Sequence, residues 1–92
     1  MEHLHSELEL EPGDVVQVNL DAPANVMLME SADYDAYRNG RPYRYFGGHA
    51  TTTPVQIPAP RSGHWHVVVD LGGSAGHVTA GIGVLRAASA TR

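Results

Sequence analysis

The chain has 92 residues, a formal net charge of -4 and no cysteine, so it is long enough for one small domain with a single hydrophobic core. Without cysteine there is neither a disulfide framework nor a thiolate metal site, and apolar burial has to stabilise the fold. The negative charge argues against a nucleic-acid partner, because neutralising phosphates requires a basic patch.

The amino terminus is acidic and polar, and it lacks the basic start and apolar run of about 7–15 residues that mark a secretory signal. No stretch of the chain approaches the roughly 20 apolar residues that cross a bilayer. We therefore expect a cytoplasmic protein without a membrane partner. Residues 3–11 alternate between polar and apolar side chains, which predicts a first strand with an acidic outer face.

Two further strands are predicted between residues 14 and 29. Residues 14–20 place Val16 and Val18 on one face, after a turn at Pro12-Gly13. Residues 26–29 are a short apolar run for which two arrangements remain open. Either both faces of a strand are buried, or the methionines lie beneath the loop that follows.

Residues 30–48 form the least regular segment, for which we predict one short helical turn near residues 33–38. Asp33 is suited to cap this turn, which pairs two tyrosines three residues apart, and Asn39-Gly40 is suited to end it. A helix longer than two turns is not expected. The segment after it is dense in arginine and aromatic residues, and we interpret the pair Gly47-Gly48 at its end as turn glycines.

The clearest strand lies near the middle of the second half of the chain. Its apolar residues fall at every second position and face a core: Trp65, Val67, Val69 and Leu71. Its other face carries His64, His66, Val68 and Asp70. A histidine on the outer face of a strand is most often a surface residue, which is the structural interpretation of this pattern.

Two more strands complete the predicted set. Val55 and Ile57 share a face after Pro54, which should lie at a sheet edge or at a strand start. A last strand is predicted over residues 78–85. Six to eight short strands with frequent turns predict an all-β fold, a small antiparallel β-sandwich or flattened barrel. We expect residues 1–86 to form this single domain and residues 87–92 to be a disordered tail.

Six short motifs follow one another along nearly the whole chain. They are Gly13-Asp-Val-Val-Gln-Val18, Ala24-Asn-Val26, Tyr37-Arg-Asn-Gly40, Tyr43-Arg-Tyr-Phe-Gly-Gly48, Ser62-Gly-His-Trp-His-Val67 and Asp70-Leu-Gly-Gly73. In this order they resemble a bacterial family catalogued as domain of unknown function 1883. The resemblance implies a compact all-β domain, similar to a small sandwich, that occurs alone or joined to a TIR-type signalling domain. It implies no catalytic residues.

Histidines at two-residue spacing suggest a metal site. The candidate ligands are His64, His66, His3 and His5. If the two strands that carry them were neighbours, four imidazoles could surround a zinc, nickel or copper ion without cysteine. No carboxylate follows His66 at the spacing of cupin-type sites, so the surface interpretation stays open beside the metal site.

Arginine and tyrosine gather in the segment after the helical turn. The candidate ligand-binding or partner-binding residues are Tyr37, Arg38, Arg41, Tyr43, Arg44 and Tyr45. Arginine pairs with carboxylate or phosphate, and tyrosine supplies rigid contact area. In the alternative interpretation the tyrosines fold inward as a satellite core and the arginines stack on them.

These patterns favour a non-catalytic binding or sensing module without a cofactor. Its partner would be a protein or a small anionic ligand, and the module could be accessory to a TIR-type signalling system. The alternatives are a small metal-binding protein that uses the two histidine pairs, and a homo-oligomeric assembly module that pairs through sheet edges.

Overall fold

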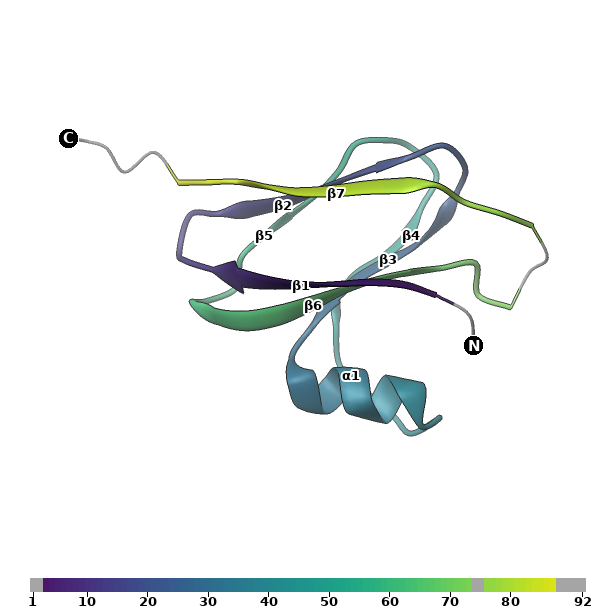
Figure 1. Ribbon diagram of the computed structural model, residues 1–92, viewed down its shortest axis with the longest axis horizontal. Coiled ribbons are helices and arrows are strands. Elements are labelled where there is room, and N and C mark those ends of the chain that lie inside the picture. The colour runs from purple at the N-terminus through teal and green to yellow at the C-terminus, as the bar shows by residue number, and fades with distance from the viewer. Residues whose placement is uncertain (1–2, 74–75, 88–92) are drawn as a thin grey trace.

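The computed structural model describes residues 3–73 and 76–87, which form seven strands and one helix (Figure 1). In chain order these are β1 (Leu4–Leu10), β2 (Val15–Leu20), β3 (Ala24–Met29), α1 (Ser31–Arg38), β4 (Phe46–Ala50), β5 (Val55–Pro58), β6 (Gly63–Asp70) and β7 (Ala80–Leu85). Within these two ranges, no helix has the length and apolar character that crossing a membrane requires.

The strands form two antiparallel sheets. One sheet has the order β1-β6-β3-β4, and the other has the order β5-β2-β7. In Figure 1 β2 and β7 lie above β1 and β6, and α1 lies below β1 and β6, so the layers are sheet, sheet and helix. The all-β fold predicted from the sequence is confirmed, and its division into two separate sheets makes it a sandwich.

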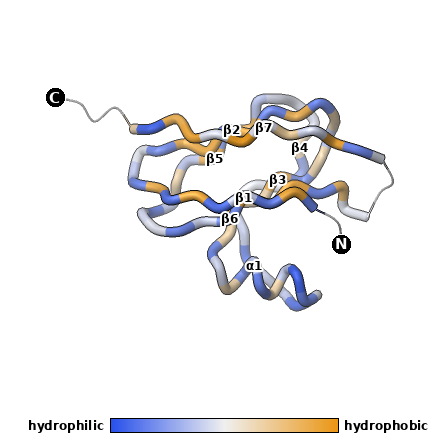
Figure 2. The backbone as a smooth tube through the Cα atoms, in the orientation of Figure 1, coloured by the Kyte–Doolittle hydropathy of each residue, from blue (hydrophilic) through white to orange (hydrophobic). Residues whose placement is uncertain are grey.

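The main hydrophobic core lies between the sheets and is centred on β6. Trp65, Val67 and Val69 are each at most 1% exposed, as their alternation predicts. Valines of β2 belong to the same cluster. The indole N–H of Trp65 donates to the carbonyl oxygen of Arg61 at 3.1 Å, so the one polar group of this side chain is satisfied. Figure 2 shows hydrophobic positions along the strands and mainly hydrophilic ones along α1.

The opposite face of β6 is buried as well, so the expectation that His66 is a surface residue was wrong. His66, Val68 and Asp70 are 7%, 0% and 4% exposed, whereas His64 remains exposed. The cause is the third layer, because tyrosines from α1 and the following loop pack over Val68. A strand covered on both sides buries both of its faces, whatever the polarity of its pattern.

Both of the arrangements that the sequence left open for residues 26–29 are found in the structure. Val26 and Leu28 of β3 lie in the main core, and Met27 and Met29 lie in a second cluster with Val68. Tyr34, Tyr37 and Tyr43 pack against this second cluster. Both faces of β3 are therefore buried, and its methionines lie beneath the segment that follows.

The helix α1 begins earlier than the predicted turn. It spans eight residues, and Glu30 is its N-cap residue without a capping side-chain bond. Asp33 lies in the first turn, and its carboxylate accepts a hydrogen bond from the backbone N–H of Arg44 at 3.0 Å. The predicted end is correct, because the helix stops at Asn39 and Gly40 has a φ of +72°.

The glycines at positions 47 and 48 lie inside β4, so their interpretation as turn residues was wrong. Gly47 is opposite Met27 of β3 in the register. A Cβ atom at Gly47 would lie 2.2 Å from the carbonyl oxygen of Val26, and the φ of Gly47 is +114°. Glycine is therefore required for the close approach of these two backbones.

The remaining strands agree with the predicted segments. Pro54 immediately precedes β5, which is an edge strand, as expected. The backbone N–H of Ala87 donates to the buried carboxylate of Asp14 at 2.9 Å. This bond ties the segment that follows β7 to the turn between β1 and β2. The rest of the predicted tail, residues 88–92, lies outside the described residues.

Candidate functional site

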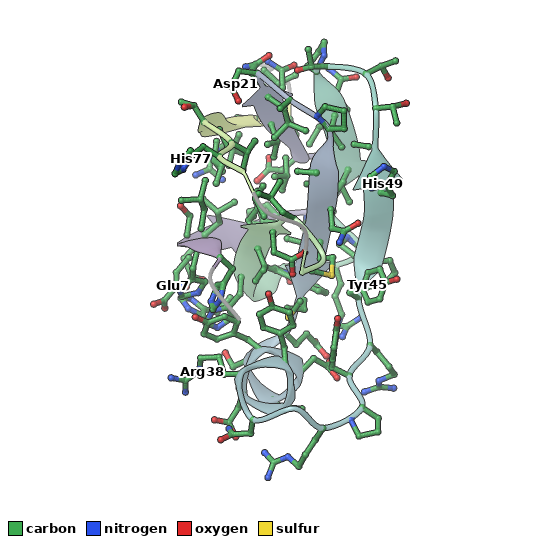
Figure 3. All side chains as sticks on the ribbon, turned by 90° about the vertical axis from the view of Figure 1, so that its right-hand side faces the viewer. Glu7, Asp21, Arg38, Tyr45, His49 and His77 are labelled. Carbon is green, nitrogen blue, oxygen red and sulfur yellow. The ribbon has the colours of Figure 1, made fainter. Side chains whose placement is uncertain are left out.

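The outer face of the four-stranded sheet, which α1 covers, carries most of the polar residues selected from the sequence. The antiparallel register places Glu7 opposite His66 between β1 and β6, and Asn25 opposite Asp70 between β3 and β6. Figure 3 shows α1 end-on, with Glu7 on one side of the molecule and Tyr45 on the other. Because β1 and β4 are opposite edges of this sheet, the face has two separate polar regions.

The first region, the histidine cluster, consists of His5 and Glu7 of β1, His64 and His66 of β6, and Ser31 of α1. His5 Nε2 lies 2.7 Å from His66 Nδ1, and Ser31 Oγ lies 2.9 Å from His66 Nε2. Both ring nitrogens of His66 are therefore engaged. His5, Glu7 and His66 each present one donor atom, and these three atoms lie within 4.8 Å of one another.

Tyr34 covers the two imidazoles of this cluster. Its ring stacks on His5 with centroids 4.0 Å apart and planes inclined by 9°, and on His66 at 4.8 Å and 11°. The guanidinium of Arg38 lies 5.2 Å from the centroid of the Tyr34 ring. The aromatic cover shields one side of the histidine pair from solvent.

The predicted set of four histidines does not converge on one point, although β1 and β6 are neighbours. His3 Nε2 lies 3.0 Å from the hydroxyl of Tyr34. His64 Nε2 lies 2.7 Å from Glu7 Oε1, and its Nδ1 contacts Glu9. Two of the four histidines, His3 and His64, therefore have other partners.

Glu7 and Ser31 are the members of the cluster that the sequence analysis missed. Glu7 follows His5 by two residues, so both side chains point to the same face of a strand, and this spacing was a usable signal. Ser31 comes from the first turn of α1, and no local pattern connects it with a histidine 35 residues later. Only the packing of α1 on the sheet brings them together.

Burial and charge set opposite ionisation preferences within the cluster. Burial lowers the pKa of His5 and the pKa of His66, so both imidazoles favour the neutral form. The hydrogen bonds that His64 makes to Glu9 and Glu7 raise the pKa of His64. The same contact with His64 lowers the pKa of Glu7. The surroundings thus favour the neutral forms of His5 and His66 and the charged forms of His64 and Glu7.

The second region, the tyrosine pocket, has a volume of about 180 Å³ and lies on the β4 side of α1. Three predicted binding residues, Tyr37, Tyr43 and Tyr45, form its aromatic wall. The ring centroids of Tyr37 and Tyr43 are 5.2 Å apart with planes at 88°, and those of Tyr43 and Tyr45 are 5.7 Å apart with planes at 40°. His49 also lines the pocket, and Figure 3 shows it on the same side of the molecule as Tyr45.

Asp70 is the buried carboxylate of the tyrosine pocket. Its Oδ1 accepts hydrogen bonds from Asn25 Nδ2 at 2.8 Å and from the backbone N–H of Gly72 at 2.9 Å. Its Oδ2 accepts a bond of 2.5 Å from the hydroxyl of Tyr37. All three donors are neutral, and within residues 3–73 and 76–87 no basic side chain forms an ion pair with Asp70.

The tyrosines of the pocket combine the two interpretations proposed from the sequence. Tyr37 and Tyr43 are half-buried against the methionine cluster, and the hydroxyl of Tyr43 lies 3.9 Å from Met27 Sδ. Tyr45 is 46% exposed. Burial raises the pKa of Tyr43, and burial followed by the bond to Asp70 raises the pKa of Tyr37. Both hydroxyls therefore stay protonated.

The three predicted arginines lie outside this pocket and pair with aspartates of α1. Arg38 Nη2 and Arg41 Nη2 contact the two oxygens of the Asp35 carboxylate at 3.2 Å and 3.0 Å. Arg44 Nε lies 3.8 Å from Asp33 Oδ1. These contacts give each arginine a carboxylate partner, although Arg38 and Arg41 share one, and they link the segment after the helix to it.

The sequence matches a known protein family. The model of a family described as domain of unknown function (DUF1883) matches residues 1–88. A search of curated proteins found no match, and neither did a search of solved structures. Since the family model covers nearly the whole chain, the protein belongs to the DUF1883 family.

Proposed function

We propose that this chain is a non-catalytic binding domain whose tyrosine pocket receives a compact organic cation, such as an alkylated ammonium group. The observation that carries this proposal is the burial of the Asp70 carboxylate beside three tyrosine rings, with only neutral hydrogen-bond donors around it. A cation over an aromatic face gains about 0.5–2 kcal/mol, and aromatic cages bind quaternary ammonium groups in this way.

The size of the pocket supports a small group. Its volume of about 180 Å³ is below the roughly 300–1,000 Å³ of sites that enclose a drug-sized molecule. The pocket therefore suits one charged head group at the end of a longer ligand or side chain. Tyr45, which is nearly half exposed, would close over that group from the solvent side.

The pairing of the arginines argues against the anionic ligand considered from the sequence. An anion at this surface would have to compete with Asp33 and Asp35 for the guanidinium groups. A cation in the tyrosine pocket displaces no ion pair, because Asp70 has no basic partner among the described residues. The resemblance to domains that are joined to TIR domains supports a role as the recognition component of a bacterial, cytoplasmic signalling system.

Titration with tetramethylammonium chloride, followed by chemical shifts of the backbone amides, tests the proposal. We expect saturable shifts at residues of the tyrosine pocket and at least tenfold weaker binding by Tyr45→Ala, whose side chain is the most exposed of the three. Arg44→Ala is the matched control, because it removes an exposed side chain outside the pocket and should bind normally.

Two results would overturn the proposal. One is that tert-butanol, a neutral molecule of similar shape, binds as well as tetramethylammonium. The other is that inorganic phosphate binds and that this binding is lost in Arg41→Ala and Arg44→Ala, which would favour the anionic ligand.

A further inference from the structure

We propose that His5, Glu7 and His66 form a binding site for a divalent transition metal of the zinc class. This site lies at the β1 edge of the sheet and does not depend on the tyrosine pocket at the β4 edge. Two imidazoles and one carboxylate, with a water in the fourth position, are a ligand set that zinc uses in proteins. The three donor atoms already lie within 4.8 Å of one another.

The distance between the two imidazoles is close to the distance that a metal requires. His5 Nε2 and His66 Nδ1 are 2.7 Å apart, with one proton between them. Tetrahedral zinc with bonds of about 2.0–2.1 Å would hold the two nitrogens about 3.3 Å apart. The two side chains therefore need to move apart by well under 1 Å for a metal ion to take the place of the shared proton.

No proton has to leave the histidine pair when the metal binds. A neutral imidazole carries one N–H, and metal ligation requires only that this N–H be on the outer nitrogen. For His66 the outer nitrogen is Nε2, which lies 2.9 Å from Ser31 Oγ, an acceptor for that proton. The proton between the rings moves to an outer nitrogen, and both inner lone pairs face the ion.

Contacts around the three ligands orient them as the outer contacts of known metal sites do. Ser31 holds the outer nitrogen of His66, and His64 holds Oε1 of Glu7 at 2.7 Å. No hydrogen bond from the described part of the chain engages the second oxygen of Glu7, which is available to a cation. Tyr34 lies flat over both imidazoles and fixes the planes of their rings.

The chemistry of the donors selects the class of metal. The set contains two nitrogens and one carboxylate and no thiolate, which suits zinc, nickel or copper better than calcium or magnesium. Bound there, the ion would join the edge strand β1 to β6, and through Ser31 and Tyr34 it would fix α1 on the sheet. With the metal bound, the histidine cluster would thus hold the third layer in place.

Calorimetric titration of tag-free, chelator-treated protein with zinc chloride tests this site. We expect one zinc per chain, and at least tenfold weaker binding by Glu7→Gln and by His5→Gln. His77→Gln is the matched control, because it removes an exposed histidine outside the cluster and should leave the affinity unchanged. Ser31→Ala should weaken binding about 10- to 100-fold through the orientation of His66.

Cobalt substitution gives a second readout that does not depend on stability. Cobalt bound to the wild type should show the intense visible absorption of a four-coordinate ion, and Glu7→Gln should lose it. The Glu7 side chain is exposed, so this variant avoids the folding defect that a change at buried His66 could cause. Equal zinc affinity in wild type, Glu7→Gln and His5→Gln, or an absence of zinc binding to the wild type, would overturn the proposal.

Discussion

The hydroxyl of Tyr37 donates a hydrogen bond of 2.5 Å to the buried carboxylate of Asp70, and this contact joins α1 to the central strand β6. The contact of Ser31 with His66 joins the helix to the same strand, four residues earlier along β6. A short helix thus covers the polar face of the sheet and is attached to it by a few specific hydrogen bonds. The methionine cluster packs between these bonds.

Removal of this hydroxyl should destabilise the protein. We expect Tyr37→Phe to lower the free energy of unfolding by about 1.5–3 kcal/mol, because Oδ2 of Asp70 loses its donor while the carboxylate stays buried. Urea denaturation followed by circular dichroism measures the change. Tyr45→Phe is the matched control and should change stability by less than about 0.5 kcal/mol, since that side chain is exposed. Equal stabilities of the two variants would contradict this role of Tyr37.

The protein should lose stability in alkaline solution through the same residue. Burial and Asp70 raise the pKa of Tyr37 above its ordinary value near 10, so the folded state keeps a proton that the unfolded state releases. The stabilising contribution is therefore complete below about pH 10 and is lost as the pH rises toward the folded pKa. Melting temperatures measured across this range should fall less steeply for Tyr37→Phe than for the wild type. Parallel curves would show that Tyr37 does not titrate in this way.

Both faces of β6 should contribute to stability. Val68 and Val69 are 0% and 1% exposed, Val68 under α1 and Val69 between the sheets. We expect Val68→Ala and Val69→Ala each to lower the free energy of unfolding by about 2–3 kcal/mol, because each deletes two buried methyl groups and leaves a cavity. Chemical denaturation compares them directly. A negligible effect of Val68→Ala would mean that the helix does not cover this face in solution.

The two faces of β6 differ in how far the sequence alone predicts their burial. A period of two residues is a property of one strand, so the inward set of Trp65, Val67 and Val69 was predictable from local pattern alone. The burial of His66 and Val68 depends on α1, an eight-residue helix with no buried residue of its own. Such a helix is stabilised by tertiary contacts, which no local pattern records.

The candidate site was predictable by residue type but not by grouping. The sequence pointed to the histidines and tyrosines as unusual side chains, but their partners depend on strand order. β1 and β6 pair across more than fifty residues, and their register, not the spacing within either strand, places Glu7 beside His66. The same holds for Asp70, which meets Tyr37 only because α1 crosses β6.

Asp14 should govern stability in acid. Backbone N–H groups of Ala87 and Glu11, and then Arg86, lower the pKa of this carboxylate. Its contribution is therefore present above the ordinary pKa of aspartate and is lost as the pH falls through the folded pKa. We expect Asp14→Asn to have a lower melting temperature near neutral pH and a smaller further loss on acidification than the wild type. Glu11→Gln, at an exposed side chain, is the control and should follow the wild-type curve.

The close approach of β3 and β4 should make position 47 intolerant of any side chain. In Gly47→Ala the new Cβ would lie 2.2 Å from the carbonyl oxygen of Val26, at a φ of +114°. Relief requires the strands to separate, so we expect a loss of more than about 2 kcal/mol in the free energy of unfolding. Gly81→Ala is the matched control within β7, where a Cβ meets nothing within 4 Å, and it should be nearly neutral. Urea denaturation of both variants decides the matter, and equal stability would mean that β4 does not pair with β3 in this register.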